Sequence, residues 1–228
     1  MYGEIHTSFQ RPAADLLDDL KDVWTSTLAD TMGRHGVMGP DIRPIFSPIH
    51  LIGIAFTVLN YPNDNITTHR ALMMAEPGDV LIIDEGRDNN TGSFGHNMSL
   101  QARNRGILGL VSNGCVRDVR MLKDEKFPVF CRAVSPRSAQ KNTPGSINVP
   151  VQVGGLVVSP GDIVVGDDDG IAVIPLGCAR DVVQRAKERT AMELQQARDI
   201  RAGKKPLEIV FGTDWVRSAL QGKVRELP

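Results

Sequence analysis

The sequence predicts an α/β protein built on a mostly parallel sheet, and two short apolar runs carry this prediction. Residues 80–83 and 107–111 are almost entirely apolar and are bounded by turn-forming residues. Strands of this kind are buried on both faces, as is typical of parallel sheets covered by helices. Residues 97–105 lie between them, contain no helix breaker and end at Gly106, which predicts a connecting helix.

The stretch from residue 91 to residue 123 organises the rest of the chain, and it predicts a loop, a helix, a strand, a turn and a second helix. Residues 112–115 are interpreted as a turn at the carboxyl end of the strand, where open α/β sheets usually bind ligands. Arg117 and Asp118 follow directly and stand at the start of the next helix.

The remaining segments complete the α/β pattern. Helical spacing of apolar residues predicts helices from residue 13 to Trp24, at 26–32, at 67–74 and at 178–202. β-Branched and apolar runs predict strands at 51–59, 128–134, 147–158 and 162–174. Residues 37–49 and 135–145 are expected to be irregular connections, and the partly apolar tail at 206–228 is expected to cover a neighbouring subunit.

The composition argues against a nucleic-acid-binding or membrane protein. The net charge is −1 and no basic stripe is present, so we expect no direct contact with nucleic acid. No apolar run approaches the length needed to cross a bilayer. Cys115, Cys131 and Cys178 form no metal-binding or redox motif, so we interpret them as core thiols of a cytoplasmic protein.

The central stretch also predicts a site for an anion. Two helix amino termini and the Arg117 guanidinium converge near one strand end, an arrangement that suits a carboxylate or an enolate. Asp118 supplies a hard oxygen suited to a divalent cation. The alternative is a surface Arg-Asp pair in the first turn of a helix. Three histidines, His35, His50 and His69, have no second ligand at metal-site spacing and are interpreted as structural.

The order of motifs resembles the RraA-like family, which includes the 4-hydroxy-4-methyl-2-oxoglutarate (HMG/CHA) aldolases. The motifs are Gly95-x-x-Met98, the strand at 106–111, and Asn-Gly-Cys-Val-Arg-Asp-Val at 113–119, with similar strands elsewhere between residues 20 and 205. The resemblance implies a single domain spanning residues 1–228, with a layered β/β/α fold of the swivelling type, N-terminal helices and a long C-terminal helix. It also implies homotrimers or hexamers with the site at the subunit interface.

The same resemblance implies roles for individual residues. Arg117 would be catalytic and would bind the oxygens of a small 2-oxo acid, and Asp118 would hold Mg²⁺ or Mn²⁺. The substrate would also be bound by Gly95, Asn97, Met98 and Asn113. Glu193, on the long helix, would act catalytically in a neighbour's site. The implied activity is that of a class II pyruvate aldolase or oxaloacetate decarboxylase, working through a pyruvate enolate.

The sequence departs from the aldolase pattern at two positions. His96 stands where the family usually has Asp or Glu, and it is the implied proton acceptor here, while Met121 replaces a usual acidic residue. A second interpretation therefore stays open: a non-catalytic, RraA-type regulator that binds ribonuclease E. Menaquinone methylation is excluded because the glycine-rich loops lack a dinucleotide-type GxGxxG motif.

Overall fold

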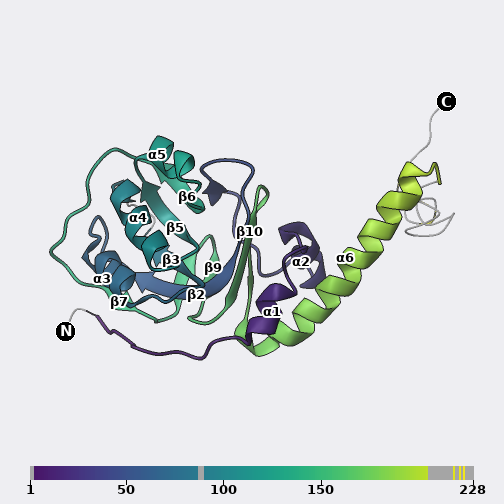
Figure 1. Cartoon of the computed structure of the whole chain (residues 1–228), viewed down its shortest axis with the longest axis horizontal. Helices are drawn as coiled ribbons and strands as arrows, with labels where there is room; N and C mark the ends of the chain where they lie inside the picture. The colour runs from purple at the N-terminus through teal and green to yellow at the C-terminus, as the bar shows by residue number, and fades with distance from the viewer. Residues whose placement is uncertain (1–2, 87–89, 205–217, 219–220, 222, 224–228) are drawn as a thin grey trace.

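The fold is built on a nine-stranded mixed sheet, seen here in a computed structural model that describes residues 3–86, 90–204, 218, 221 and 223. The main path of the sheet runs in the order β1-β6-β5-β3-β2-β10-β11, while β4 pairs with β5 and β7 with β2 (Figure 1). The strands are β1 (Arg43–Pro44), β2 (Leu51–Leu59), β3 (Asp79–Asp84), β4 (Gly92–Phe94), β5 (Gly109–Val116), β6 (Val129–Val134), β7 (Ser146–Ile147), β10 (Ile163–Asp167) and β11 (Gly170–Ile174).

The centre of the sheet is parallel, as the apolar runs predict. β2, β3, β5 and β6 pair in parallel, whereas β10 joins β2 antiparallel and forms a hairpin with β11. Alternate residues of β3 enter different cores: Leu81 and Ile83 face one side of the sheet, and Val80 and Ile82 face the other. Both faces of this strand are therefore buried, which explains why its sequence shows no polar alternation.

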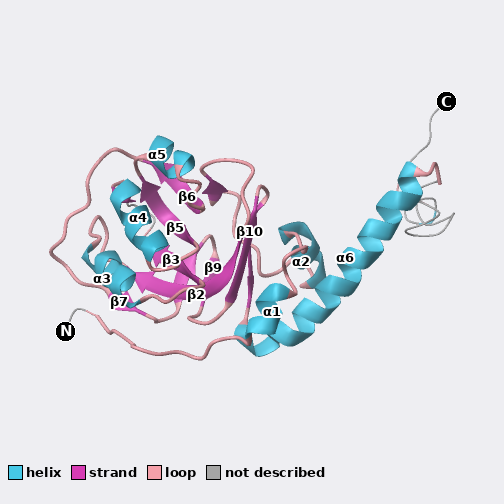
Figure 2. Ribbon diagram, viewed as in Figure 1, coloured by secondary structure: helices cyan, strands magenta, loops and turns pink. Residues whose placement is uncertain are grey.

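Three short helices cover one face of the sheet (Figure 2). They are α3 (Ile66–Met74), α4 (His96–Asn104) and α5 (Val119–Asp124). Leu72, Ala102 and Leu122 from these helices share a core with Leu81 and Leu110 of the sheet. The carboxyl ends of β4 and β5 consequently lie beside the amino termini of α4 and α5.

The opposite face is covered by a separate two-stranded hairpin, β8 (Val151–Val153) and β9 (Leu156–Val158). Val151, Val153 and Val158 pack in a core with Val80 and Ile82 of the sheet. Helices, sheet and hairpin form successive layers, so the layered α/β fold is confirmed.

A third core joins the helices at the two ends of the chain to the β10–β11 hairpin. The helices are α1 (Ala14–Asp18), α2 (Thr25–Thr31) and α6 (Ala179–Arg201), the last preceded by a 3₁₀ turn, η1 (Leu176–Cys178). Leu28 and Val183 pack with Ile163 and Val165 of β10. α6 continues well beyond this core and projects away from the sheet (Figure 1).

Several local expectations are wrong. The helix expected from residue 13 to Trp24 ends at Asp18 and gives way to turns, although Leu20 and Val23 remain buried. Residues 112–115, expected as a turn, continue β5, because β4 and β6 pair with this part of the strand. Cys178 is exposed rather than in the core. The tail at 206–228 lies largely outside the described residues.

No helix in the described part of the chain is both long enough and apolar enough to cross a bilayer.

Candidate functional site

A cavity of about 250 Å³ lies where the ends of β4 and β5 meet the amino terminus of α4. Its walls come from four places in the sequence: the start of α3, the segment from β4 into α4, the residues between β5 and α5, and the irregular segment after β6. Five residues expected at the site line this cavity, namely Gly95, Asn97, Met98, Arg117 and Asp118. The structure therefore brings together the core of the site that the sequence indicates.

Arg117 is fixed at its backbone and at its guanidinium. Its N–H donates to the carbonyl of Phe94 at 2.9 Å, so β4 holds the residue just after β5 ends. Nη1 donates to Ser138 Oγ at 2.7 Å. The side chain is 40% exposed. An anion entering the cavity therefore meets a cation whose position is already set.

Asp118 adopts a left-handed backbone conformation, with φ of 59° and ψ of 34°. Such a conformation is uncommon for a residue other than glycine, and such outliers concentrate at functional sites. The carbonyl of Asp118 accepts the N–H of Leu122 as α5 begins, and Oδ2 accepts the N–H of His96 at 3.0 Å. This carboxylate thereby links the starts of α4 and α5.

Glycines at two positions let these charged side chains approach the backbone. A Cβ on Gly95 would lie 2.4 Å from Asp118 Oδ2 and 3.0 Å from Arg117 Cγ. A Cβ on Gly92 would lie 2.8 Å from Arg117 Cβ. The glycines of the motif are therefore required by close packing against Arg117 and Asp118.

The first turn of α4 offers one free amide where two were expected. The N–H of Met98 donates to the carbonyl of Gly95 at 3.0 Å. The N–H of Asn97 has no protein acceptor in the part of the chain that the structure describes. An anion at this helix start would be bound by the amide of Asn97.

The start of α3 and the residue before it contribute two polar side chains that sequence reasoning did not assign to the site. Asn65 and His69 line the cavity one helical turn apart. Asn65 Nδ2 donates to the carbonyl of Ser93, while Asn65 Oδ1 and His69 Nε2 are buried without a hydrogen-bond partner. Burial, assisted by the charge of Lys141, lowers the pKa of His69, so its imidazole is neutral near pH 7. The interpretation of His69 as merely structural missed this placement, which the spacing of Asn65 and His69 could have indicated.

The last wall is the segment after β6, which supplies Ser138 and Lys141. Lys141 adds a second cation to that of Arg117. Asp118 is the one carboxylate among the described residues that line the cavity, so the cavity carries a net positive charge that suits an anionic ligand. An irregular segment has no readable motif, so no sequence signal indicates these two residues.

The donor set fits a magnesium ion that is completed by water and substrate. Among the described residues, no three His, Cys, Asp or Glu side chains cluster to hold a metal ion. Mg²⁺ commonly binds through one or two carboxylates and keeps several waters or substrate oxygens. Asp118 Oδ1 has no partner in the described structure, so Asp118 can supply such a carboxylate.

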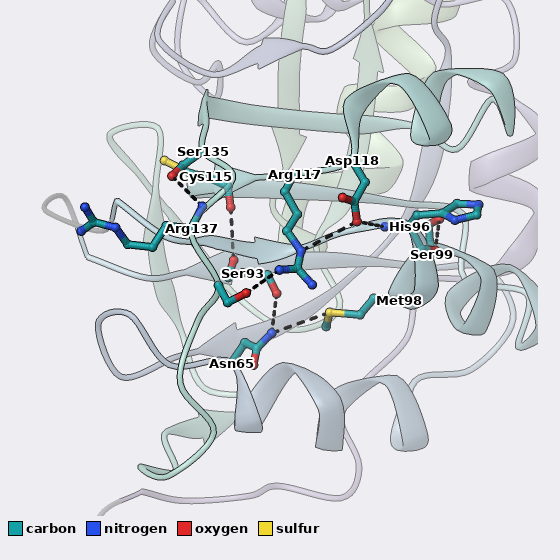
Figure 3. Close-up of polar contacts among 11 residues, drawn as sticks. Asn65, Ser93, His96, Met98, Ser99, Cys115, Arg117, Asp118, Ser135 and Arg137 are labelled. Atoms are coloured by element: carbon teal, nitrogen blue, oxygen red, sulfur yellow. Dashed lines mark hydrogen bonds and ion pairs between the residues drawn. The ribbon is translucent and has the colours of Figure 1, made fainter.

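Three predicted residues lie outside the cavity in this chain. The imidazole of His96 points away from Arg117 (Figure 3), and its Nε2 is 3.8 Å from Glu125 Oε1. Glu193 lies on α6, where it accepts hydrogen bonds from Thr27 and Arg189.

Asn113 is the third predicted residue outside the cavity, and it faces the hairpin side of the sheet. Its Nδ2 donates to Asp84 Oδ1 and to the carbonyl of Gln152. It lines a separate cavity of about 500 Å³ together with Asp84 and Arg132. Asn113 is two residues along β5 from Val111, which packs in the core beneath the hairpin, so both side chains lie on that face of the sheet. Arg117 follows the end of β5, beyond the register shift between Ser112 and Cys115, and lies on the other side.

The fold and the cavity define a class: an α/β protein with a small, positively charged anion site at the ends of parallel strands. A family model described as RraA-like: Aldolase/RraA matches residues 14–173. A protein of Halalkalibacterium halodurans, provisionally named a 4-hydroxy-4-methyl-2-oxoglutarate aldolase, is 34% identical over 186 residues, covering 82% of this chain and 89% of that protein. The chain therefore belongs to the RraA-like family.

Solved structures agree with this assignment. An uncharacterised protein from Pseudomonas syringae pv. tomato superposes with a TM-score of 0.79 at 26% identity, covering 88% of this chain and 99% of that one. RraAS2 of Streptomyces coelicolor, described as an unusual member of the RNase ES inhibitor RraA protein family, gives a TM-score of 0.75 at 26% identity, covering 83% and 99%. The family therefore contains both aldolase-named and inhibitor-named relatives.

Proposed function

We propose that this protein is a carbon–carbon lyase that acts on a small 2-oxo acid and releases pyruvate through its enolate. The observation that carries the proposal is the joint placement of Arg117, Asp118 and the free amide of Asn97 around one cavity. These groups match the charges of a 2-oxo acid, which presents a carboxylate and a polarised carbonyl oxygen side by side.

Three residues of the chain would have separate roles in binding and catalysis. Arg117 would bind the keto oxygen and stabilise the negative charge that develops there as the carbon–carbon bond breaks. The amide of Asn97 would orient the carboxylate. The neutral imidazole of His69 is better placed than that of His96 to accept a proton from the bound acid, because His69 lines the cavity.

A divalent cation, Mg²⁺ or Mn²⁺, is part of the proposal, with Asp118 as its protein ligand. When bound, it would supply Lewis-acid polarisation of the 2-oxo group. Decarboxylation of oxaloacetate requires little beyond this electron sink, whereas aldol cleavage of 4-hydroxy-4-methyl-2-oxoglutarate also requires a base. Oxaloacetate decarboxylation is therefore the less demanding of the two activities.

We further propose that the site is completed in a homotrimer or hexamer, with Glu193 acting from a neighbouring copy. The outer part of α6 supports this, because Met192 and Leu194 are 61% and 53% exposed on a helix that projects from the chain (Figure 1). Glu193 stands between them in the sequence.

The test is pyruvate release from oxaloacetate and from 4-hydroxy-4-methyl-2-oxoglutarate, measured with added Mg²⁺ and with EDTA. Turnover of either substrate that EDTA abolishes and Mg²⁺ restores is the expected result. No turnover of either substrate at micromolar protein would contradict the proposal.

A second candidate function is protein-binding regulation of a ribonuclease, favoured by the likeness to RraAS2. It predicts inhibition of ribonuclease E activity by this protein at micromolar concentration, independent of Arg117. Adding the Arg117→Ala variant to the same assay separates the two functions.

A further inference from the structure

The segment of residues 135–145 forms a wall of the cavity without the support of a helix or a strand ladder. It places Ser138 against Arg117 Nη1 at 2.7 Å and Lys141 at the cavity's edge. Within the segment, the regular pairing consists of two isolated bridges, from Ser138 to Gly92 and from Gln140 to Asp64. The carbonyl of Arg137 accepts the N–H of Gly92, and Gln140 forms backbone hydrogen bonds with Asn63 and Asn65.

The carboxylate of Asp64 adds side-chain hydrogen bonds that join the wall to the start of α3. Its Oδ2 accepts the N–H groups of Asn142 at 2.6 Å and Thr143 at 2.9 Å, both in the wall segment. Its Oδ1 accepts the N–H of Ile66, the first residue of α3, at 2.9 Å. One carboxylate thus joins the wall that carries Ser138 and Lys141 to the helix that carries His69.

The charge of Asp64 is directed to these backbone groups. The residue is 3% exposed and forms no ion pair within the described structure. Burial alone would raise the pKa of Asp64, but the three N–H donors, assisted by the charge of Lys141, outweigh burial and lower it. The carboxylate is therefore ionised at neutral pH, and hydrogen bonds to an ionised acceptor are stronger than neutral ones.

We propose that Asp64 is a positioning residue for the site: it clamps residues 138–143 onto the start of α3, and through Ser138 it fixes the guanidinium of Arg117. Asp64 does not line the cavity, so its effect on a ligand is indirect. The kinetic part of the inference rests on the proposed lyase activity, and the structural part does not.

Asp162 provides a matched control. It is 6% exposed, and its carboxylate likewise accepts backbone N–H groups, those of Ser159 at 2.8 Å and Leu176 at 3.0 Å. These contacts lie at the start of β10 and before α6, away from the cavity. Asp162→Asn therefore makes the same chemical change as Asp64→Asn without touching the wall.

The experiment compares Asp64→Asn, Asp162→Asn, Ser138→Ala and the Asp64→Asn/Ser138→Ala double variant in the full chain. We expect Asp64→Asn to speed amide exchange at Asn142 and Thr143 about tenfold or more, because a neutral amide has one acceptor oxygen in place of two charged ones and cannot accept from both the wall and Ile66. We expect it to lower kcat/KM for oxaloacetate by about tenfold, since small displacements of a positioning group have large kinetic effects. Asp162→Asn should change neither.

The double variant separates positioning from stability. If Asp64 acts through Ser138, the double variant loses less than the product of the two single losses, because the two residues share one path to Arg117. Multiplicative losses, or faster exchange with unchanged kcat/KM, would overturn the proposal. If Asp64→Asn does not fold, Asp64→Ser keeps an acceptor for Ile66 but is too short to reach the wall, and the same comparison is made with it.

Failure of the proposed function is recognised separately. If the wild-type protein does not turn over oxaloacetate, the Kd of oxalate with Mg²⁺, measured by calorimetry, replaces the kinetic readout. A Kd raised by about tenfold in Asp64→Asn, but not in Asp162→Asn, supports the clamp. An unchanged Kd overturns it. If the wild type binds no oxalate, the proposed function fails and amide exchange decides the clamp: equal exchange at Asn142 and Thr143 in Asp64→Asn and wild type overturns it.

Discussion

Nε of Arg117 lies 3.7 Å from Oδ2 of Asp118, so the two opposite charges are neighbours without a hydrogen bond between them. Each is held by another group: Arg117 donates to Ser138, and Asp118 accepts from the backbone of His96. Because the two groups form no hydrogen bond with each other, both can still bind a ligand. The two side chains are 40% and 37% exposed, and each has a fixed partner in addition to the other.

Arg117→Ala should abolish turnover of oxaloacetate while leaving the fold intact. Removing the guanidinium takes away the group that stabilises the developing charge, and losses on the order of a hundredfold or more are usual for such groups. The measurement is kcat/KM alongside circular dichroism. Arg120→Ala is the control, because that side chain is 94% exposed on α5. Retention of most activity by Arg117→Ala would place the active site elsewhere.

Asp118→Asn should remove the Mg²⁺ dependence together with turnover. An amide oxygen carries no charge and is a weaker ligand for a hard cation than a carboxylate oxygen. Titration calorimetry with Mg²⁺ in the presence of oxalate measures the effect directly. Asp124→Asn is the control, since its side chain is 71% exposed. Equal Mg²⁺ binding by wild type and Asp118→Asn would exclude Asp118 as the metal ligand.

Gly95→Ala should inactivate the protein although it adds a single methyl group. The new Cβ would lie 2.4 Å from Asp118 Oδ2, so the carboxylate must move. Gly177→Ala tests the specificity of the effect, because a Cβ on Gly177 meets no atom within 4 Å. We expect activity to fall about tenfold or more in Gly95→Ala and to stay unchanged in Gly177→Ala. Comparable activity in both variants would show that the close approach at Gly95 is not required.

His69→Gln should impair aldol cleavage of 4-hydroxy-4-methyl-2-oxoglutarate, the reaction that requires a base, more than His96→Gln does. His69 lines the cavity, whereas the imidazole of His96 faces Glu125. We expect a loss of about tenfold or more for His69→Gln, because general acid–base groups contribute at least that much. We expect a change below about threefold for His96→Gln. The reverse order in kcat/KM would restore His96 as the proton acceptor.

Glu85→Gln should remove a pH dependence of stability. Burial raises the pKa of Glu85 to about 8, although hydrogen bonds from Ser93, Ser112 and Asn60 oppose the shift. The unfolded state loses this proton near its ordinary pKa of 4.5, while the folded state keeps it, so the free energy of unfolding falls as pH rises from about 4.5 to 8. The loss for a shift of this size is on the order of 3–5 kcal/mol.

Urea denaturation at pH 5, 7 and 8.5 measures this effect. The Glu85→Gln variant should lose less stability than the wild type between pH 5 and 8.5. Glu188→Gln, on the exposed face of α6, should follow the wild type. Parallel pH profiles for Glu85→Gln and wild type would show that Glu85 is already ionised in the folded protein.

The sequence by itself determined the layered α/β fold and the core of the candidate site. Apolar runs, helix breakers and glycines act locally, so they indicated β3, α4 and the approach of Arg117 and Asp118 without knowledge of distant contacts. The expected turn at 112–115 was wrong because β4 and β6 extend β5 by pairing with it, and pairing is a long-range property.

The tertiary structure alone decided which other groups share the cavity. His69 and Lys141 are 72 positions apart in sequence and meet at the cavity, where the backbone of Gln140 and the carboxylate of Asp64 both join the wall segment to the start of α3. Asn113 and Arg117 are four positions apart, yet Asn113 lies on the hairpin side of the sheet. The direction of a side chain in a strand depends on strand pairing and register, and the position of a loop depends on hydrogen bonds to distant residues. Neither can therefore be predicted from the pattern of neighbouring residues alone.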